Sequence, residues 1–187
     1  MQEIIISKAL LTRIGHAVIE EIRENTDKGL DQEGKPFQKY SSNPLYIPAG
    51  AIFAPGWNTT GKRLLSKKEA EFRNKKGGKR WVIIPGGYAV LKNTRFPQEG
   101  GKVNLHLTGN MMNGLAITEQ GTNFIKIGFS NTEAATKAMY HQVMGAGKRK
   151  VKRKFLGLPQ DILNGIVNSY AEQFKNEIET KFFEGLG

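Results

Sequence analysis

The chain contains no cysteine in its 187 residues. This absence excludes disulfide bonds, thiolate metal sites and cysteine nucleophiles. Aspartate is also scarce, because only Asp27, Asp31 and Asp161 occur, and this argues against a two-metal nuclease built on clustered aspartates. We expect a protein that is made in a reducing cytoplasm, or that belongs to something assembled there.

Long apolar stretches are missing as well. No apolar run approaches the roughly 20 residues that a membrane-spanning helix needs. The first residues, Met1-Gln2-Glu3, lack the charged start and the apolar core of a signal peptide. We therefore expect neither export nor a membrane partner.

The motifs of the common enzyme classes do not occur in the sequence either. His16, His106 and His141 lie in separate segments without HxxxH or HExxH spacing, so they do not indicate a metal site. There is no P-loop, no GxSxG motif and no dinucleotide-binding glycine pattern. We predict no enzymatic activity, and we identify no catalytic residue, metal ligand or cofactor.

Positive charge is what the chain has in excess. Its 28 Lys and Arg residues outnumber 17 Asp and Glu residues, which gives a formal net charge of +11 at pH 7. Residues 62–80 alone hold nine basic residues against two glutamates. A polyanion such as nucleic acid is a candidate partner, although lysine-rich loops are more often simply solvated.

The most concentrated basic segment covers residues 148–154, where every position except Val151 is Lys or Arg. Such a segment is either an edge strand whose charge prevents aggregation or a surface that contacts phosphate groups. We expect Phe155 and Leu156, which follow it, to anchor it in the core. The candidate DNA-facing residues are Lys148, Arg149, Lys150, Lys152, Arg153 and Lys154.

Two amphipathic helices are expected near the ends of the chain. After a β-branched lead-in at residues 4–6, Ser7 is a suitable N-cap for a helix over residues 8–25. Pro159 suits the first position of a second helix of roughly 24 residues that ends at Gly185. The apolar stripe of this second helix repeats every four residues and consists of Ile162, Ile166, Tyr170, Phe174, Ile178 and Phe182.

Shorter elements lie between these helices. Residues 115–119 and 124–129 are typical of two antiparallel strands, and a helix capped by Asn131 or Thr132 should follow and end at residues 145–147. Residues 81–84 predict a strand, and residues 105–113 predict one or two helical turns. An S-x-x-E capping-box pattern at Ser66 favours a short helix over residues 66–74.

Residues 41–61 hold three prolines together with several aromatic residues, which excludes a regular helix over most of this segment. An aromatic segment of this kind usually packs against its own domain or against a neighbouring subunit. We expect an extended, arm-like insertion at about residues 41–102 within a single domain that covers residues 1–187. Its candidate subunit-interface residues are Tyr46, Ile47, Phe53 and Trp57.

Several short motifs follow one another in an order that resembles a known family. Gly34-Lys35-Pro36-Phe37 comes first and is followed by Tyr40-Ser41-Ser42. A Leu-x-x-Thr-Gly-x-Met turn occupies residues 105–111, and the expected helix ends in Tyr140-His141-Gln142. The segment 153–158 then leads into the last helix.

In this order the chain resembles the phage virion morphogenesis proteins, which are tail-completion and neck proteins of tailed bacteriophages related to the Mu-type morphogenesis protein. It is similar also to HK97-type neck proteins. The resemblance covers about residues 30–183 and is strongest over residues 103–165. The chain departs from the family in having Leu158-Pro159 where a serine cap is expected, and in a longer, more proline-rich segment at residues 41–102.

The resemblance implies an α+β fold in which a small antiparallel sheet packs against long N- and C-terminal helices. It implies a non-enzymatic structural protein of the virion, assembled in the host cytoplasm. Copies of the chain would form a ring, with six subunits favoured over twelve, at the head–tail junction. The ring's partners would be the connector or head-completion protein on one side and the tail terminator or tail tube on the other, with genomic DNA in its lumen.

Other functions stay open at this stage. The same small subunits and ring geometry suit a tail terminator or a head-completion protein. A basic nucleic-acid-binding module of another kind would account for the charge alone, and it predicts salt-sensitive binding by the isolated chain. An enzyme is the least supported alternative, because no catalytic constellation is present.

Overall fold

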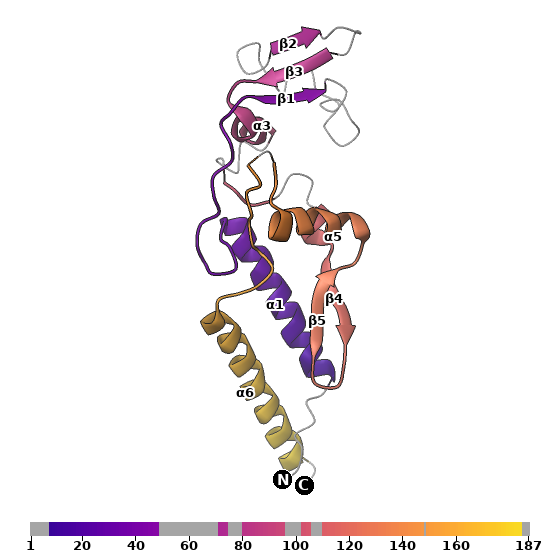
Figure 1. Cartoon of the computed structure of the whole chain (residues 1–187). Coiled ribbons are helices and arrows are strands. Elements are labelled where there is room, and N and C mark those ends of the chain that lie inside the picture. The colour runs from indigo at the N-terminus through magenta and orange to yellow at the C-terminus, as the bar shows by residue number, and fades with distance from the viewer. Residues whose placement is uncertain are drawn as a thin grey trace. The chain divides into compact units, whose positions relative to one another are not determined.

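The computed structural model of the chain describes residues 8–48, 71–74, 80–95, 102–105, 110–147 and 149–184. It confirms the expected α+β class, because helices are combined with two small antiparallel sheets (Figure 1). The chain divides into two compact units. The discontinuous unit is formed by Met1–Phe37 with Asn104–Gly187, and the inserted unit by Gln38–Val103.

The first helix, α1, spans Lys8–Lys28 and forms the centre of the discontinuous unit. Its buried face includes Leu10, Leu11, Ile19 and Ile22, as its periodicity predicts. The helix continues past the expected end at residue 25 and stops before Gly29, which adopts a left-handed conformation with φ +83°. The N–H groups of Gly29 and Leu30 donate to the carbonyls of Thr26 and Asn25, which closes the last turn in a Schellman motif.

An antiparallel hairpin packs against α1. Strand β4 covers Leu115–Gln120 and β5 covers Ile125–Phe129, with Leu115 paired to Phe129. The hairpin approaches the helix closely at Gly15, where an added Cβ would lie 2.6 Å from Ile125 Cδ1 and 2.7 Å from Ile117 Cδ1. Both expected strands are thus present, and a glycine on α1 makes room for them.

The half-buried Arg23 links α1 to the start of the hairpin. Its Nε donates to the carbonyl of Met112 at 3.3 Å, and its Nη2 donates to the carbonyl of Leu115 at 3.1 Å. Met112 belongs to the one-turn helix α4, Asn110–Asn113, whose carbonyl groups have no partner within the helix. Arg23 therefore satisfies backbone oxygens as well as forming an exposed ion pair with Glu20.

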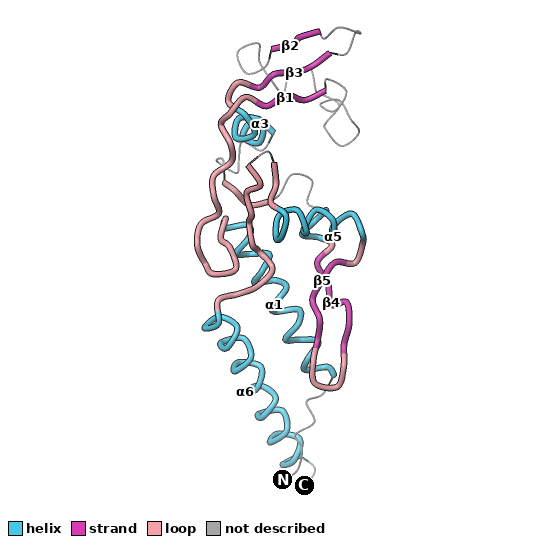
Figure 2. The backbone as a smooth tube through the Cα atoms, in the orientation of Figure 1, coloured by secondary structure: helices cyan, strands magenta, loops and turns pink. Residues whose placement is uncertain are grey.

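A second helical layer follows the hairpin. Helix α5 spans Thr132–Met139 and begins at Asn131, whose Oδ1 accepts the N–H of Ala134 at 2.8 Å. It continues into the π-helical turn η2, Tyr140–Met144, which ends at Gly145. Figure 2 shows the chain then running as an irregular loop to the final helix. The capping prediction at Asn131 and the termination at residues 145–147 are confirmed.

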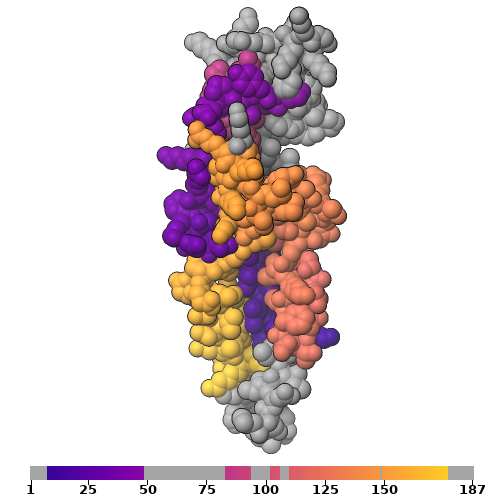
Figure 3. Space-filling model, in the orientation of Figure 1, coloured from indigo at the N-terminus to yellow at the C-terminus, as the bar shows by residue number. Residues whose placement is uncertain are grey.

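The final helix, α6, spans Gln160–Glu184 and packs against α1 (Figure 3). Of its predicted apolar stripe, Ile162, Ile166, Tyr170 and Phe174 are half-buried, and the side chains of Ile178 and Phe182 are outside the described part. Val167, at the edge of the stripe, is 41% exposed. The α1–α6 contact therefore leaves apolar surface on α6 that the discontinuous unit does not cover fully.

The inserted unit holds a three-stranded antiparallel sheet in the order β1-β3-β2. Its strands are β1, Leu45–Pro48, β2, Glu71–Asn74, and β3, Arg80–Ile84. Helix α3, Gly87–Arg95, follows β3 and buries Leu91 against Ile84, with Leu45 and Ile47 packed around them. Lys92 on the same helix is buried too, and its Nζ lies 3.5 Å from the Tyr40 hydroxyl.

Some expectations for the middle of the chain are corrected. Residues 71–74 do not belong to a helix: they form strand β2, because pairing with β3 outweighs the local capping pattern. The expected helical turns at residues 105–113 are seen as α4, and residues 106–109 are outside the described part. The expected strand at residues 81–84 is confirmed as β3. The lead-in at residues 4–6 is outside the described part as well.

Candidate polyanion and subunit interface

The basic segment folds back on η2 as a tight hairpin. Ala146 and Val151 exchange two backbone hydrogen bonds of 2.9 and 3.1 Å, and the N–H of Lys150 donates to the carbonyl of Gly147 at 3.0 Å. Gly145, Gly147 and Lys150 all have positive φ. At Gly145 any side chain would collide with the backbone of Lys150, so a glycine is needed here for the basic segment to fold back on η2.

Side chains alternate between solvent and core along the returning segment. Lys152 and Lys154 are exposed, whereas Arg153 and Phe155 are 6% and 2% exposed. Such alternation is typical of an extended chain with one face on the core. Phe155 anchors the segment as expected and meets the ring of Phe129 edge-on at 6.4 Å.

This alternation divides the candidate DNA-facing residues. Arg149 and Lys150 lie exposed on the turn, and Lys152 and Lys154 lie exposed on the returning segment. Arg153 is buried instead, so it is not part of the exposed basic surface. Lys148 is outside the described residues. We call Arg149, Lys150, Lys152 and Lys154 the basic hairpin surface.

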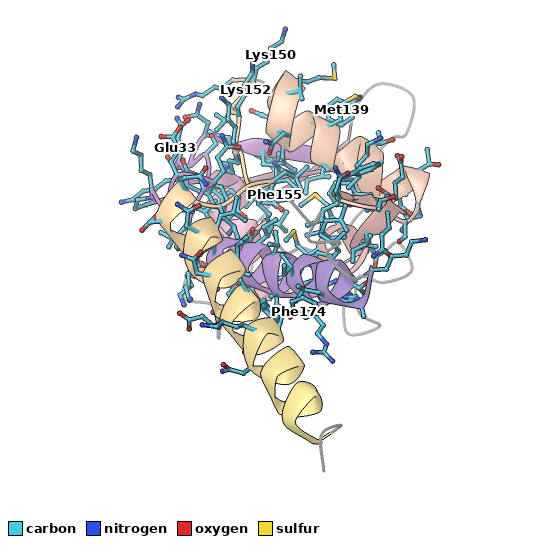
Figure 4. All side chains as sticks on the ribbon, turned by 90° about the horizontal axis from the view of Figure 1, so that it is seen from below. Glu33, Met139, Lys150, Lys152, Phe155 and Phe174 are labelled. Carbon is cyan, nitrogen blue, oxygen red and sulfur yellow. The ribbon has the colours of Figure 1, made fainter. Side chains whose placement is uncertain are left out.

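The basic hairpin surface adjoins exposed apolar side chains. Met139, Tyr140, Val143 and Met144 are 44–59% exposed and come from the end of α5 and from η2. We call these four residues the apolar patch. In Figure 4, Met139 lies on the same side of the discontinuous unit as Lys150 and Lys152. The sequence prediction did not identify this patch, although four apolar residues within six positions were a signal for it.

Gln142 connects the segments that meet behind this surface. Its Oε1 accepts the N–H groups of Phe155 at 2.9 Å and Leu156 at 3.2 Å. Its Nε2 donates to Oε1 of Gln32 at 3.2 Å, and the N–H of Gln32 donates to the carbonyl of Lys154 at 2.8 Å. One amide side chain thus joins the loop after α1, the turn η2 and the returning segment.

His141 is the perturbed titratable group at this surface. Burial lowers its pKa, and repulsion from Arg153 lowers it further. Its Nδ1 is buried without a hydrogen-bond partner, while its carbonyl accepts the N–H of Arg153 at 2.8 Å. The neutral imidazole is therefore favoured at this position.

The predicted subunit-interface residues lie in the inserted unit or outside the described residues. Tyr46 is 62% exposed on the edge strand β1, so it is free to meet a partner. Its neighbour Ile47 packs instead against the Ile84 and Leu91 core of the inserted unit. Phe53 and Trp57 are outside the described residues. Tyr46 alone therefore keeps an exposed position among those that can be located.

The described residues hold no group of three or more His, Asp or Glu side chains that could bind a metal ion. Within the same residues, no helix has the length and hydrophobicity that a bilayer crossing requires. Comparisons of the chain with protein-family models, with curated proteins and with solved structures found no match.

Proposed function

We propose that the chain is a structural virion protein of a tailed phage, namely a tail-completion or neck subunit that forms a ring between the head connector and the tail. In this proposal genomic DNA passes through the lumen of the ring. The basic hairpin surface offers a polyanion four exposed cations, and none of them forms an ion pair with the described acidic residues.

One observation carries the proposal. The motifs behind the family resemblance are far apart in sequence, yet several meet in one place. Gln142, from the Tyr-His-Gln motif, bonds to Phe155 and Leu156 of the segment 153–158 and to Gln32 beside the Gly-x-Pro-Phe loop. Phe37 of that loop is buried, and a Cβ at Gly34 would lie 3.6 Å from Pro159. Residues from these separate motifs therefore contact one another in one part of the discontinuous unit.

The test is electron microscopy of lysates from the phage that encodes the chain, with this gene disrupted and with complementation from a plasmid as the control. We expect full heads and finished tails that lie apart, because heads and tails are each completed even when the protein that joins them is missing. Complementation should restore joined particles. Overlong tails would instead assign the chain to a tail terminator, and intact infectious particles would contradict the proposal.

A second candidate function rests on the charge alone. A net charge of +11 with an unpaired basic hairpin surface suits a nucleic-acid-binding module outside the virion. That alternative gains support if disruption leaves the particles infectious and the purified chain binds DNA with a steep salt dependence.

A further inference from the structure

The surface formed by the basic hairpin and the apolar patch has a feature that DNA does not require. Phosphate groups need cations, whereas Met139, Tyr140, Val143 and Met144 offer exposed apolar area beside those cations. Aromatic residues, methionine and arginine are enriched in protein–protein interfaces. The mixture favours an occupant that is itself a protein surface with both acidic and apolar groups.

Contact of the patch with the same patch on a second copy is disfavoured. Residues 137–154 carry seven Lys or Arg residues and no Asp or Glu. A two-fold contact would bring two such segments together, and like charges that face each other across an interface oppose association. If a second copy covers the patch, it must use a different face.

Helix α6 provides a face of opposite charge. Its sequence holds five acidic residues against two lysines. At about 100° per residue, the exposed Asp161 and Glu172 share the outer side of the helix with Lys175. The exposed Ala171 lies roughly 90° round the helix from the two carboxylates and the exposed Val167 roughly 130°, on the flank next to the half-buried stripe. Within the described residues neither Asp161 nor Glu172 forms an ion pair.

The two faces lie on opposite sides of the discontinuous unit. In Figure 4 Met139 and Phe174, which mark the patch and α6, lie on either side of the buried Phe155. Two different, complementary faces on opposite sides of one subunit produce a head-to-tail contact, and such contacts close into rings or continue as filaments.

We propose that the apolar patch, with Lys150 and Lys152, binds one flank of α6 of a second copy, around Val167 and Ala171. Asp161 and Glu172, on the adjoining outer side of α6, then neutralise Lys150 and Lys152 across the interface, and Arg149 and Lys154 stay available to DNA. This inference rests on the proposed function, since it names the contact by which copies of the chain would build the proposed ring.

Site-specific cross-linking tests the contact, because the natural chain has no cysteine. Two single variants, Val143→Cys and Ala171→Cys, are oxidised separately and as a mixture. A head-to-tail contact gives cross-linked dimers in the mixture and few in either variant alone. Dimers from Val143→Cys alone would show a two-fold contact, and no dimers in any sample would also overturn the proposal.

Charge reversal supplies the second measurement. Mass measurements in solution should show that K150E/K152E, and separately D161K/E172K, shift the chain from its oligomer to the 20.8 kDa monomer. Combining all four substitutions in one chain should restore the oligomer, because the opposite charges face each other again. The control K8E/K126E makes the same change in net charge away from the hairpin and should leave the oligomer intact.

The outcomes separate this contact from the proposed function. Oligomers that survive both reversals would overturn the contact while leaving the virion role open to the lysate experiment. Oligomers that depend on the contact, found together with intact infectious particles after gene disruption, would support the contact and contradict the virion role. A natural chain that stays monomeric at all concentrations would overturn the contact.

Discussion

At the scale of single residues, the side chain with the clearest structural role is Gln142. Two backbone N–H groups point at one of its amide atoms, which identifies that atom as the oxygen. Sequence reasoning placed Gln142 at the end of a helix but gave it no partner, because its partners are 13, 14 and 110 residues away. Only the folded chain reveals that an amide is needed here.

Replacing Gln142 tests this role. Gln142→Leu should lower the free energy of unfolding by about 2–3 kcal/mol, because two partly buried N–H groups lose their acceptor. Gln142→Glu keeps an acceptor oxygen at the same place, so its free energy of unfolding should fall much less. Urea denaturation of both variants gives the comparison. Equal losses would show that the side chain acts by its volume and not as an acceptor.

His141 makes stability depend on pH. Its pKa in the folded chain lies below the ordinary value of 6.5, so the unfolded chain binds this proton more readily. The stability that comes from the neutral imidazole is complete above pH 6.5 and is lost as the pH falls from there towards the folded pKa.

The measurement compares urea midpoints at pH 7.5 and pH 5.5. His141→Phe should show a smaller drop between these values than the natural chain, because the titrating group is gone. The matched variant His16→Phe changes an exposed histidine and should retain the natural drop. A natural drop that persists in His141→Phe would contradict this origin of the pH dependence.

At the scale of elements, close packing of the hairpin on α1 explains the glycine at position 15. The same substitution can be made in two helices. Gly165→Ala in α6 meets open space and should raise stability by about 0.5–1 kcal/mol through helix propensity. Gly15→Ala brings a Cβ to 2.6 Å from Ile125 Cδ1, so overpacking should cancel that gain.

Thermal and urea unfolding of the two variants should therefore differ by about 1 kcal/mol or more, with Gly15→Ala the less stable. A gain of the same size in both would mean that Ile117 and Ile125 move aside without cost. That result would contradict a tight contact between α1 and the hairpin.

The elements that local signals control were predictable. α1, α6, the β4–β5 hairpin and the capped α5 follow from periodicity, turn residues and the Asn131 cap. Strand β2 was wrongly expected as a helix because its conformation depends on pairing with β3. Helix α3 was not expected, since its residues lie within the segment that was interpreted as an extended, arm-like insertion.

The candidate site was predictable in part. The basic segment and the burial of Phe155 follow from composition and chain order. The burial of Arg153 could have been inferred from its spacing, because residues two apart on an extended segment share a face. The run of four apolar residues within six positions signals an apolar cluster at the patch, but its exposure depends on how η2 faces solvent, which the local sequence does not determine.

At the scale of the whole molecule, basic side chains differ in whether they form ion pairs with carboxylates. Exposed lysines elsewhere in the discontinuous unit, such as Lys35, Lys126 and Lys137, pair with glutamates. The basic hairpin surface holds four exposed cations without such pairs in the described residues. A polyanion should therefore bind at the hairpin in preference to the rest of the surface.

Two variants of equal net charge test this preference. Changing Arg149, Lys150, Lys152 and Lys154 to Ser lowers the formal charge from +11 to +7, since 11 − 4 = 7. Changing Lys8, Lys35, Lys126 and Lys137 to Ser gives the same total. In DNA titrations, only the first variant should reduce the slope of log K against log salt, by up to about 0.9 for each phosphate group that the chain no longer neutralises. Equal slopes for both variants would show that net charge alone controls binding.

The discontinuous unit also has a consequence for the order in which the chain folds during synthesis. The apolar face of α1 leaves the ribosome well before the strands and the helix that cover it, which lie beyond residue 104. The inserted unit, Gln38–Val103, is complete much earlier, and domains generally fold as units during synthesis. The inserted unit can therefore fold before the discontinuous unit. The apolar side chains of α1, namely Leu10, Leu11, Ile19 and Ile22, stay exposed to solvent until the C-terminal segment has been synthesised.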